Sequence, residues 1–317
     1  PPATIFNTTV FKKFLQKIFK IVSYGFFLKI HGKIETSIEI SDDSRIKVKI
    51  INIEKDLRYK VYKINNGRLY TDRVHDTAAI LENKIINGPS FQWRYTQDRE
   101  IYNSNVGENI VFEKGTPRIL RNLNGKVLSL LTGGAGNNNY WHWLFDVLPR
   151  LGLCSKDINL EKIDYFLCPS LLKKFQNETL DCLNISKHKR LSSEKFRHIK
   201  AKELIVTDHP FVVTGDASRD NQNIPSWIMI WLKKSFLNQN KLNNKKIKNK
   251  IYIDRGEATS GHTSQRLISN ENEIKKYLLE NDFTSVKLGD INFVDQVDLF
   301  HNADCIVGLH GAGFANL

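Results

Sequence analysis

Segments typical of strands and of helices alternate along the second part of the chain, and this alternation constrains the fold more than any other feature. The predicted strands are 164–168, 203–207, 250–254, 284–288 and 304–308. The predicted helices are 138–151, 170–183, 226–237, 270–280 and 293–302. Such an order is typical of a parallel sheet covered by helices. The sequence therefore predicts an α/β protein whose ligands bind at the carboxyl ends of the strands.

The first part of the chain has a different pattern. Short β-like segments separated by Asn, Gly and Asp turns are 37–40, 46–53, 59–64, 109–112 and 126–131. We expect one acceptor-side domain over 35–237, β-rich at first and then built of βα units. The Lys- and Asn-rich residues 238–249 offer almost nothing to bury and are predicted to be a linker. Residues 250–317 form a second βα set, so a cleft between two units is expected. In that set, Asn270 and Glu273 have the pattern of a helix N-cap and its reciprocal partner.

Residues 1–34 contain six Lys and no acidic residue. Helical spacing relates the apolar residues Phe11, Phe14, Leu15, Ile18, Phe19 and Val22. A basic amphipathic helix of this kind either lies in a membrane interface, with Lys on anionic headgroups, or packs on its own domain. Lys interrupts each apolar run, so neither a spanning helix nor a signal peptide is predicted. We expect a cytoplasmic protein that can be peripheral on the inner face of the cell membrane.

The basic excess of the chain does not indicate a nucleic-acid binder. The 47 basic and 34 acidic residues give a net charge of +13. This charge gathers in 1–34, 186–202 and 233–250, without zinc-finger spacing, an RNP-like run or a basic zipper. The sequence has no Walker A motif, no H-E-x-x-H and no paired CxxC, which argues against an ATPase or a zinc enzyme. It also has no Asp-x-Asp pair, so no metal and no cofactor are expected.

The helix predicted at 138–151 carries a polar stripe. Asn139, His142 and Asp146 fall at i, i+3 and i+7. The opposite, apolar stripe is Tyr140, Leu144, Val147, Leu148 and Leu151. An Asp one turn after a His can hold its tautomer and raise its basicity, as a general base requires. The alternative is a capped core helix whose His satisfies a backbone group.

A glycine-rich loop follows the last predicted strand. His310-Gly311-Ala312-Gly313 is expected to open a helix, where backbone N–H groups attract phosphate and a Cβ would block a diphosphate. Arg255, at the end of the strand 251–254, is placed to meet the same anion, and Arg266 follows eleven residues later. A purely structural turn is the alternative. No G-x-S-x-G nucleophile elbow accompanies the loop, which excludes an esterase site.

These motifs, taken in order, resemble those of glycosyltransferase family 61. The matching segments are 139–150 (NYWHWLFDVLPR), 251–255 (IYIDR), 266–273 (RLISNENE), 292–296 (NFVDQ) and 307–313 (VGLHGAG). The resemblance spans about residues 126–317. It implies a GT-B fold, with two Rossmann-like domains facing a cleft. It also implies inverting transfer of a hexose or pentose from a nucleotide-diphosphate sugar, UDP-sugar being expected, to a hydroxyl of a glycan, polysaccharide or lipid-linked acceptor, as in capsular polysaccharide biosynthesis.

The resemblance also implies roles for single residues. Arg255 and Arg266 would meet the diphosphate, and Asn139 would reach it from the first domain. The loop beneath it supplies His310, Gly311, Ala312 and Gly313, with Asn316. The base, His142 or Asp146, rests on the helix pattern instead.

Three departures from the family pattern accompany the resemblance. Asp254 stands where Ser is common, and Asp295 stands where Glu is common. The family continues beyond the final loop, so the donor domain 250–317 is expected to be incomplete. A non-catalytic nucleotide-sugar or glycan-binding module is the alternative function.

Overall fold

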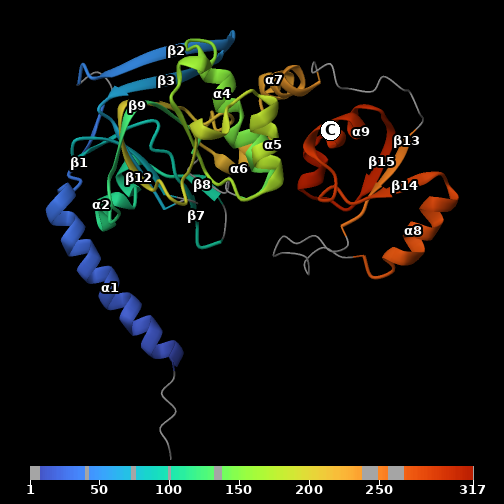
Figure 1. The fold of residues 1–317 in the computed structure, drawn as a ribbon, viewed down its shortest axis with the longest axis horizontal. Helices are drawn as coiled ribbons and strands as arrows, with labels where there is room; N and C mark the ends of the chain where they lie inside the picture. Colours follow the sequence, from blue (N-terminus) through green and yellow to red (C-terminus); the bar gives the residue numbers. More distant parts are fainter. Residues whose placement is uncertain are drawn as a thin grey trace, which may run out of the picture.

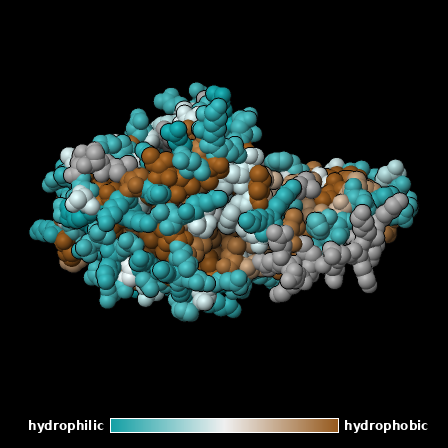
Figure 2. Space-filling view, turned by 90° about the horizontal axis from the view of Figure 1, so that it is seen from above, coloured by the Kyte–Doolittle hydropathy of each residue, from teal (hydrophilic) through white to brown (hydrophobic). Residues whose placement is uncertain are grey.

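The computed structural model describes residues 8–39, 43–72, 76–98, 101–131, 138–237, 249–255 and 268–316. It is a mixed α/β protein with a large sheet and a small parallel sheet, each accompanied by helices (Figure 1). Hydrophilic side chains cover most of the face seen from above, with apolar side chains between them (Figure 2).

The large sheet joins the β-rich part of the chain to the βα units. Its main path runs β1 (Thr36–Ile38), β6 (Lys84–Ile86), β5 (Thr77–Leu81), β4 (Arg68–Thr71), β12 (His198–Thr207), β9 (Arg121–Ser129), β10 (Tyr165–Cys168) and β11 (Arg190–Ser192). The hairpin of β2 (Ile46–Glu54) and β3 (Leu57–Asn65) is attached through pairing of β3 with β12. Strands β9 to β12 pair in parallel, whereas β3 and β4 meet β12 antiparallel. β12 is thus the junction of a mixed sheet, not of the purely parallel one that alternation predicts.

One predicted strand is wrong. Residues 109–112 lead into a short helix, α2 (Val111–Lys114), after the turn η2 (Val106–Glu108). The Asn109 side chain decides this, because its Oδ1 accepts from the Val111 backbone N–H at 3.2 Å and its Nδ2 donates to the Thr77 carbonyl at 3.2 Å. Asn side chains commonly favour such local turns over a strand ladder. A two-stranded sheet of β7 (Trp93–Tyr95) and β8 (Ile101–Asn103) precedes this segment.

Helices cover one face of the large sheet and enclose its main core. They are α4 (Pro149–Cys154), α5 (Lys174–Cys182), α6 (Ala217–Gln222) and α7 (Ser226–Phe236), with the turns η4 (Leu160–Lys162) and η5 (Lys187–Lys189). Trp143 lies fully buried in this core, and its indole Nε1 donates to Thr179 Oγ1 at 2.8 Å. Gly152 lets α4 approach α7, since a Cβ there would come within 2.8 Å of Trp231 Nε1. Burying each large apolar side chain contributes about 1.5–3 kcal/mol, so this layer holds the sheet and its helices together.

The small parallel sheet has the strand order β14 (Phe283–Val286), β13 (Asn249–Ile253), β15 (Ala303–Gly308). This order is the start of a doubly wound sheet. Its helices are α8 (Glu271–Glu280), α9 (Phe293–His301) and the five-residue 3-10 helix η7 (Ala312–Asn316). The structure confirms the strands and helices predicted here. The predicted cap differs, because the Asn270 side chain makes no cap bond and instead donates from Nδ2 to Glu273 Oε2 at 3.3 Å.

The two sheets are linked by contacts between their helices. The Glu178 Oε2 of α5 accepts from the Phe293 backbone N–H at 2.9 Å, and the Phe236 and Phe293 rings lie 4.8 Å apart. In a third contact between the two parts, the Tyr140 hydroxyl donates to Asn316 Oδ1 of η7. The segment predicted to be a linker falls, apart from residue 249, outside the described residues.

Helix α1 (Thr8–His31) extends away from the large unit (Figure 1). Its end is docked through His31, whose ring lies 4.7 Å from that of His198 and whose Nε2 hydrogen-bonds the Arg118 carbonyl at 3.0 Å. Within the part of the chain that the structure describes, no helix has the length and apolar character needed to cross a membrane.

Candidate active site

His142 and Asp146 form a hydrogen-bonded pair at the start of the predicted helix. His142 Nδ1 lies 2.7 Å from Asp146 Oδ2, and the two side chains are 16% and 0% exposed. The short helix α3 (Tyr140–His142) begins at Asn139, whose Oδ1 accepts from the Trp141 and His142 N–H groups at 2.9 and 3.3 Å. Asn139 is therefore the N-cap that fixes the backbone of the imidazole-bearing turn.

The segment after α3 is a π-helical turn, η3 (Trp143–Val147), followed at once by α4. In it the Leu148 N–H donates to the Trp143 carbonyl at 3.0 Å, five residues back. Such turns are rare and frequent at functional sites. The predicted two-stripe helix is wrong in one respect, because Trp143, Phe145 and Asp146 are buried together with the apolar stripe. The carboxylate thus faces the core and not solvent.

A buried guanidinium supports the pair from the next turn. Arg150 is 4% exposed, and its Nε donates to the Asp146 carbonyl at 3.1 Å. Its Nη1 donates to Thr207 Oγ1 at 3.0 Å, which ties the pair to the carboxyl end of β12. Burial lowers the pKa of Arg150 to about 10, with Asp146 opposing the shift, so the group remains a cation at neutral pH.

The electrostatics of the pair suit a general base. Burial alone would lower the pKa of His142, but the charge and hydrogen bond of Asp146 outweigh it and raise that pKa above its usual value. Burial also raises the pKa of Asp146, against the effects of His142 and Arg150. With Nδ1–H donated to the carboxylate, the lone pair of His142 is on Nε2. An imidazole held in this way can take a proton from a hydroxyl group.

Trp93 and His209 surround the pair and were not found from the sequence. The Trp93 ring centroid lies 5.7 Å from that of His142 and 5.7 Å from that of His209. His209 Nδ1 accepts from the backbone N–H of Phe211 at 3.4 Å and of Val212 at 3.3 Å, so its proton is on Nε2. Burial, then Arg150 and His142, lowers the pKa of His209 well below its usual value, which keeps the ring neutral.

Three buried polar atoms around the pair have no hydrogen-bond partner among the described residues. They are Asp146 Oδ1, His209 Nε2 and Trp93 Nε1. Buried polar atoms are rarely left so, and those that are need an explanation. One of these atoms is an acceptor and two are donors. No sequence signal indicated this cluster, since its members come from distant segments.

The predicted Arg255, which follows strand β13, contacts the final loop. Arg255 Nη1 donates to the His310 carbonyl at 3.0 Å, and a Cβ on Gly311 would lie 3.1 Å from that Nη1. Arg266 lies outside the described residues. Asp254, which stands where Ser is common in the family, is paired with Lys275 Nζ at 2.9 Å.

The glycines of the loop have packing partners within the protein. A Cβ on Gly313 would come within 2.7 Å of Leu288 Cδ1. The residues after Gly311 form the 3-10 helix η7, which extends to the last described residue. Contacts within the protein therefore account for the absence of a side chain at Gly313.

Asn316 connects the loop to helix α3, which carries His142. Its Oδ1 accepts from the Tyr140 hydroxyl, and its Nδ2 donates to Gln296 Oε1 at 3.2 Å and to the Gly313 carbonyl at 3.3 Å. Tyr140 lies on α3, two residues before His142. The structure thus brings two motifs that are separated by more than 150 residues into direct contact through this hydrogen bond.

Fold and site together define an α/β protein with a buried, hydrogen-bonded His–Asp pair and a glycine-rich loop that follows a parallel strand. Comparison with protein families identifies it further. The family Glycosyltransferase 61 matches residues 140–317, more than half of the chain, and the chain belongs to this family. Membership implies glycosyltransferase activity in general. A search of curated proteins found no match.

Proposed function

We propose that the protein is an inverting glycosyltransferase that moves a hexose or pentose from a nucleotide-diphosphate sugar, in the first instance a UDP-sugar, to a hydroxyl of a glycan, polysaccharide or lipid-linked acceptor. The observation that carries the proposal is the hydrogen bond from Tyr140, on the short helix that also bears His142, to Asn316, in the helix that follows the loop contacted by Arg255. Family membership supports the reaction class.

In the proposed reaction, His142 Nε2 removes the proton of the acceptor hydroxyl. The acceptor oxygen attacks the anomeric carbon, and the bond from that carbon to the diphosphate oxygen breaks with its electron pair leaving on the nucleotide. A single displacement of this kind inverts the anomeric centre. Asp146 stabilises the imidazolium that forms, and a base positioned in this way contributes on the order of 10² to 10⁴ in rate.

We assign the binding of the leaving nucleotide diphosphate mainly to residues 250–317. Arg255 and Arg266 neutralise it, and the residues His310, Gly311, Ala312, Gly313 and Asn316 line its site, with Asn139 opposite. Each preorganised donor on the departing oxygen is worth roughly 3 kcal/mol. Guanidinium groups replace a divalent ion in this scheme, in keeping with a sequence that has no Asp-x-Asp pair. Residues 35–237 then form the acceptor side and 250–317 the donor side of a GT-B arrangement.

Helix α1 supports a location at the inner face of the cytoplasmic membrane. Residues 8–31 contain five Lys and no acidic residue. Several of their large apolar side chains are exposed, among them Phe14, Phe19 and Val22 at 57, 70 and 65%. Basic helices with such an apolar face bind the interface of anionic bilayers. A lipid-linked acceptor, or a capsule-type polysaccharide assembled at the membrane, fits this placement.

The experiment compares nucleotide binding with sugar turnover. A thermal-shift screen of nucleotides identifies the ligand. Release of that nucleotide from its sugar is then measured for wild type, His142→Ala, Arg255→Ala and the remote control Arg58→Gln. We expect the first two variants to lose turnover and the control to retain it. Binding of a nucleotide together with turnover that none of the variants changes would favour the alternative, a non-catalytic nucleotide-sugar or glycan-binding module.

A further inference from the structure

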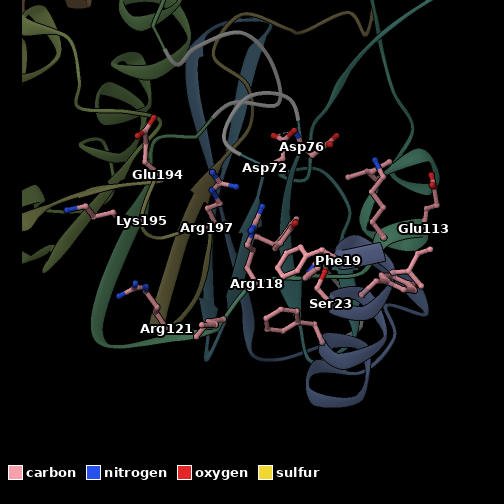
Figure 3. Close-up of a pocket in the computed structure, with 18 of the residues that line it drawn as sticks. Phe19, Ser23, Asp72, Asp76, Glu113, Arg118, Arg121, Glu194, Lys195 and Arg197 are labelled. Carbon is pink, nitrogen blue, oxygen red and sulfur yellow. Dashed lines mark hydrogen bonds between the residues drawn. The ribbon is translucent and has the colours of Figure 1, made fainter. Parts of the chain in front are cut away.

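A pocket of about 1660 Å³ lies between α1 and the large sheet (Figure 3). One wall is a stripe of α1 at intervals of four residues: Leu15, Phe19, Ser23 and Phe27. Three guanidinium groups, those of Arg118, Arg121 and Arg197, line it from the side of the sheet. The pocket thus places an apolar helix face next to cations from separate segments.

Two of these arginines, Arg118 and Arg121, also contact neighbouring elements. The Arg118 carbonyl bonds both His31 Nε2 at 3.0 Å and His198 Nδ1 at 3.1 Å, which fastens α1 and β12 to the same residue. The guanidinium of Arg121 lies over the Phe196 ring at 5.1 Å. Because the docking contacts of Arg118 use its carbonyl, its side chain can be replaced without breaking them.

The lining also contains the carboxylates of Asp72, Asp76, Glu113 and Glu194, and these are not spread evenly. Asp76 is paired with Arg94 at 3.0 Å. Figure 3 shows Asp72 and Asp76 together at one end of the pocket, with Arg121 at the other and Arg118 near Phe19 of α1. Around Arg118, near Phe19 of α1, the pocket therefore combines positive charge with apolar surface.

This pocket is separate from the His–Asp pair. It reaches Arg197, directly before β12, whereas Arg150 and Asp146 are tied to Thr207 at the other end of that strand. A strand rises about 3.3 Å per residue, so the length of β12 places the two sites roughly 30 Å apart. A ligand in the pocket would not reach the base.

The apolar stripe continues outside the pocket. Leu15 and Phe19 line the pocket, yet their side chains are still 48 and 70% exposed. Phe26, on the same side of the α1 helix, is 59% exposed. A ligand with an anionic group on the arginines and apolar chains along this stripe would satisfy both chemistries. Membrane phospholipids have this composition, and a free anion does not.

We propose that this pocket binds the phosphate headgroup of an anionic membrane phospholipid, with the phosphate on Arg118 and Arg121 and the acyl chains along Leu15 and Phe19. This proposal rests on the membrane placement of α1 proposed above and adds a defined headgroup site to it. Guanidinium groups match phosphate geometry, and basic residues at an anionic surface add to membrane affinity.

The test is cosedimentation of the full chain with phosphatidylcholine vesicles that contain or lack phosphatidylglycerol. Arg118→Gln and Arg121→Gln are compared with Arg58→Gln, which removes one equal charge from an exposed position on β3. Val61 of β3 pairs with Thr207, so Arg58 lies beyond the opposite end of β12. We expect each pocket variant to weaken binding to phosphatidylglycerol vesicles about fivefold. Arg58→Gln should bind as wild type does.

A second measurement distinguishes binding of a lipid headgroup in the pocket from binding of the apolar face of α1 to the membrane surface. Short-chain phosphatidylglycerol, below its micelle concentration, should raise the melting temperature of wild type and of Phe14→Ser, but not of Arg121→Gln. Phe14 does not line the pocket, so its replacement should weaken vesicle binding alone.

The proposal is overturned if the arginine variants bind vesicles as wild type does, or if inorganic phosphate raises the melting temperature as much as the lipid does. A wild type that binds neither vesicle also overturns it. Sugar-nucleotide turnover, measured separately without lipid, decides the proposed enzymatic function independently.

Discussion

The hydrogen bond between Asp146 and His142 makes a specific prediction for Asp146→Asn. The carboxylate raises the pKa of His142 and holds its proton on Nδ1. An asparagine amide can donate to Nδ1 instead, which would place the ring proton on Nε2 and remove the base. The turnover number should fall by about 10² to 10⁴, the range that a positioned base contributes.

The pH dependence of turnover tests whether the charge of Asp146 raises the pKa of His142. The base works only when His142 is neutral, so wild-type activity should be lost as the pH falls through a pKa above about 6.5, the usual value for histidine. Without the charge of residue 146 the pKa of His142 falls, and the acid limb of the residual activity should move to lower pH.

Initial rates of nucleotide release between pH 5 and pH 9 test both parts. Asp157→Asn is a matched control, because Asp157 is paired with Lys63 at 2.7 Å in the same unit. The reasoning is refuted if Asp146→Asn keeps the wild-type rate and acid limb while Asp157→Asn behaves identically. Urea unfolding of both variants checks that the fold is retained.

Three further predictions concern the donor site, packing and acid stability. Arg255→Ala should lower kcat/KM for the sugar nucleotide about 10²-fold, corresponding to about 3 kcal/mol, while unfolding in urea is unchanged; an unaltered kcat/KM would remove Arg255 from the diphosphate site. Gly152→Ala should lower the free energy of unfolding by about 1–3 kcal/mol, because its Cβ meets Trp231 at 2.8 Å. Gly289→Ala, with nothing within 4 Å, should change it by less than about 1 kcal/mol, and equal effects of the two in urea titrations would contradict the packing argument. Burial lowers the pKa of His198 to about 3, so below pH 6.5 the unfolded chain takes up a proton that the folded chain does not. The free energy of unfolding should therefore decrease by about 1.4 kcal/mol per pH unit from this group between pH 6 and pH 4, and His198→Gln should lose that part of the slope.

Local patterns predicted much of the secondary structure. The βα alternation located β10, β13, β14 and β15 and the helices that follow them, because apolar periodicity and caps act over a few residues. The pairing of β12 with β3 depends on contacts between residues such as Leu204 and Ile64, which are far apart in the sequence. No local pattern indicates that pairing, so the mixed sheet could not be predicted.

In the candidate site, too, local contacts were predictable from the sequence and contacts between distant segments were not. The His142–Asp146 pair is a local i, i+4 contact and was predictable, whereas its burial came from the π-helical turn ahead of Pro149. Trp93 and His209 reach it from other segments and carried no signal. The loop glycines were singled out for phosphate binding, yet Gly313 also has a packing reason in Leu288.

The central claim is that one nucleotide-diphosphate sugar lies between the imidazole of His142 and the site formed by Arg255 and the 310–313 loop. A crystal structure of the complex with a non-hydrolysable UDP-sugar tests it most directly. We expect the diphosphate oxygens about 3 Å from the Arg255 guanidinium, with the anomeric carbon facing His142. A diphosphate bound away from Arg255 and the 310–313 loop would contradict the account.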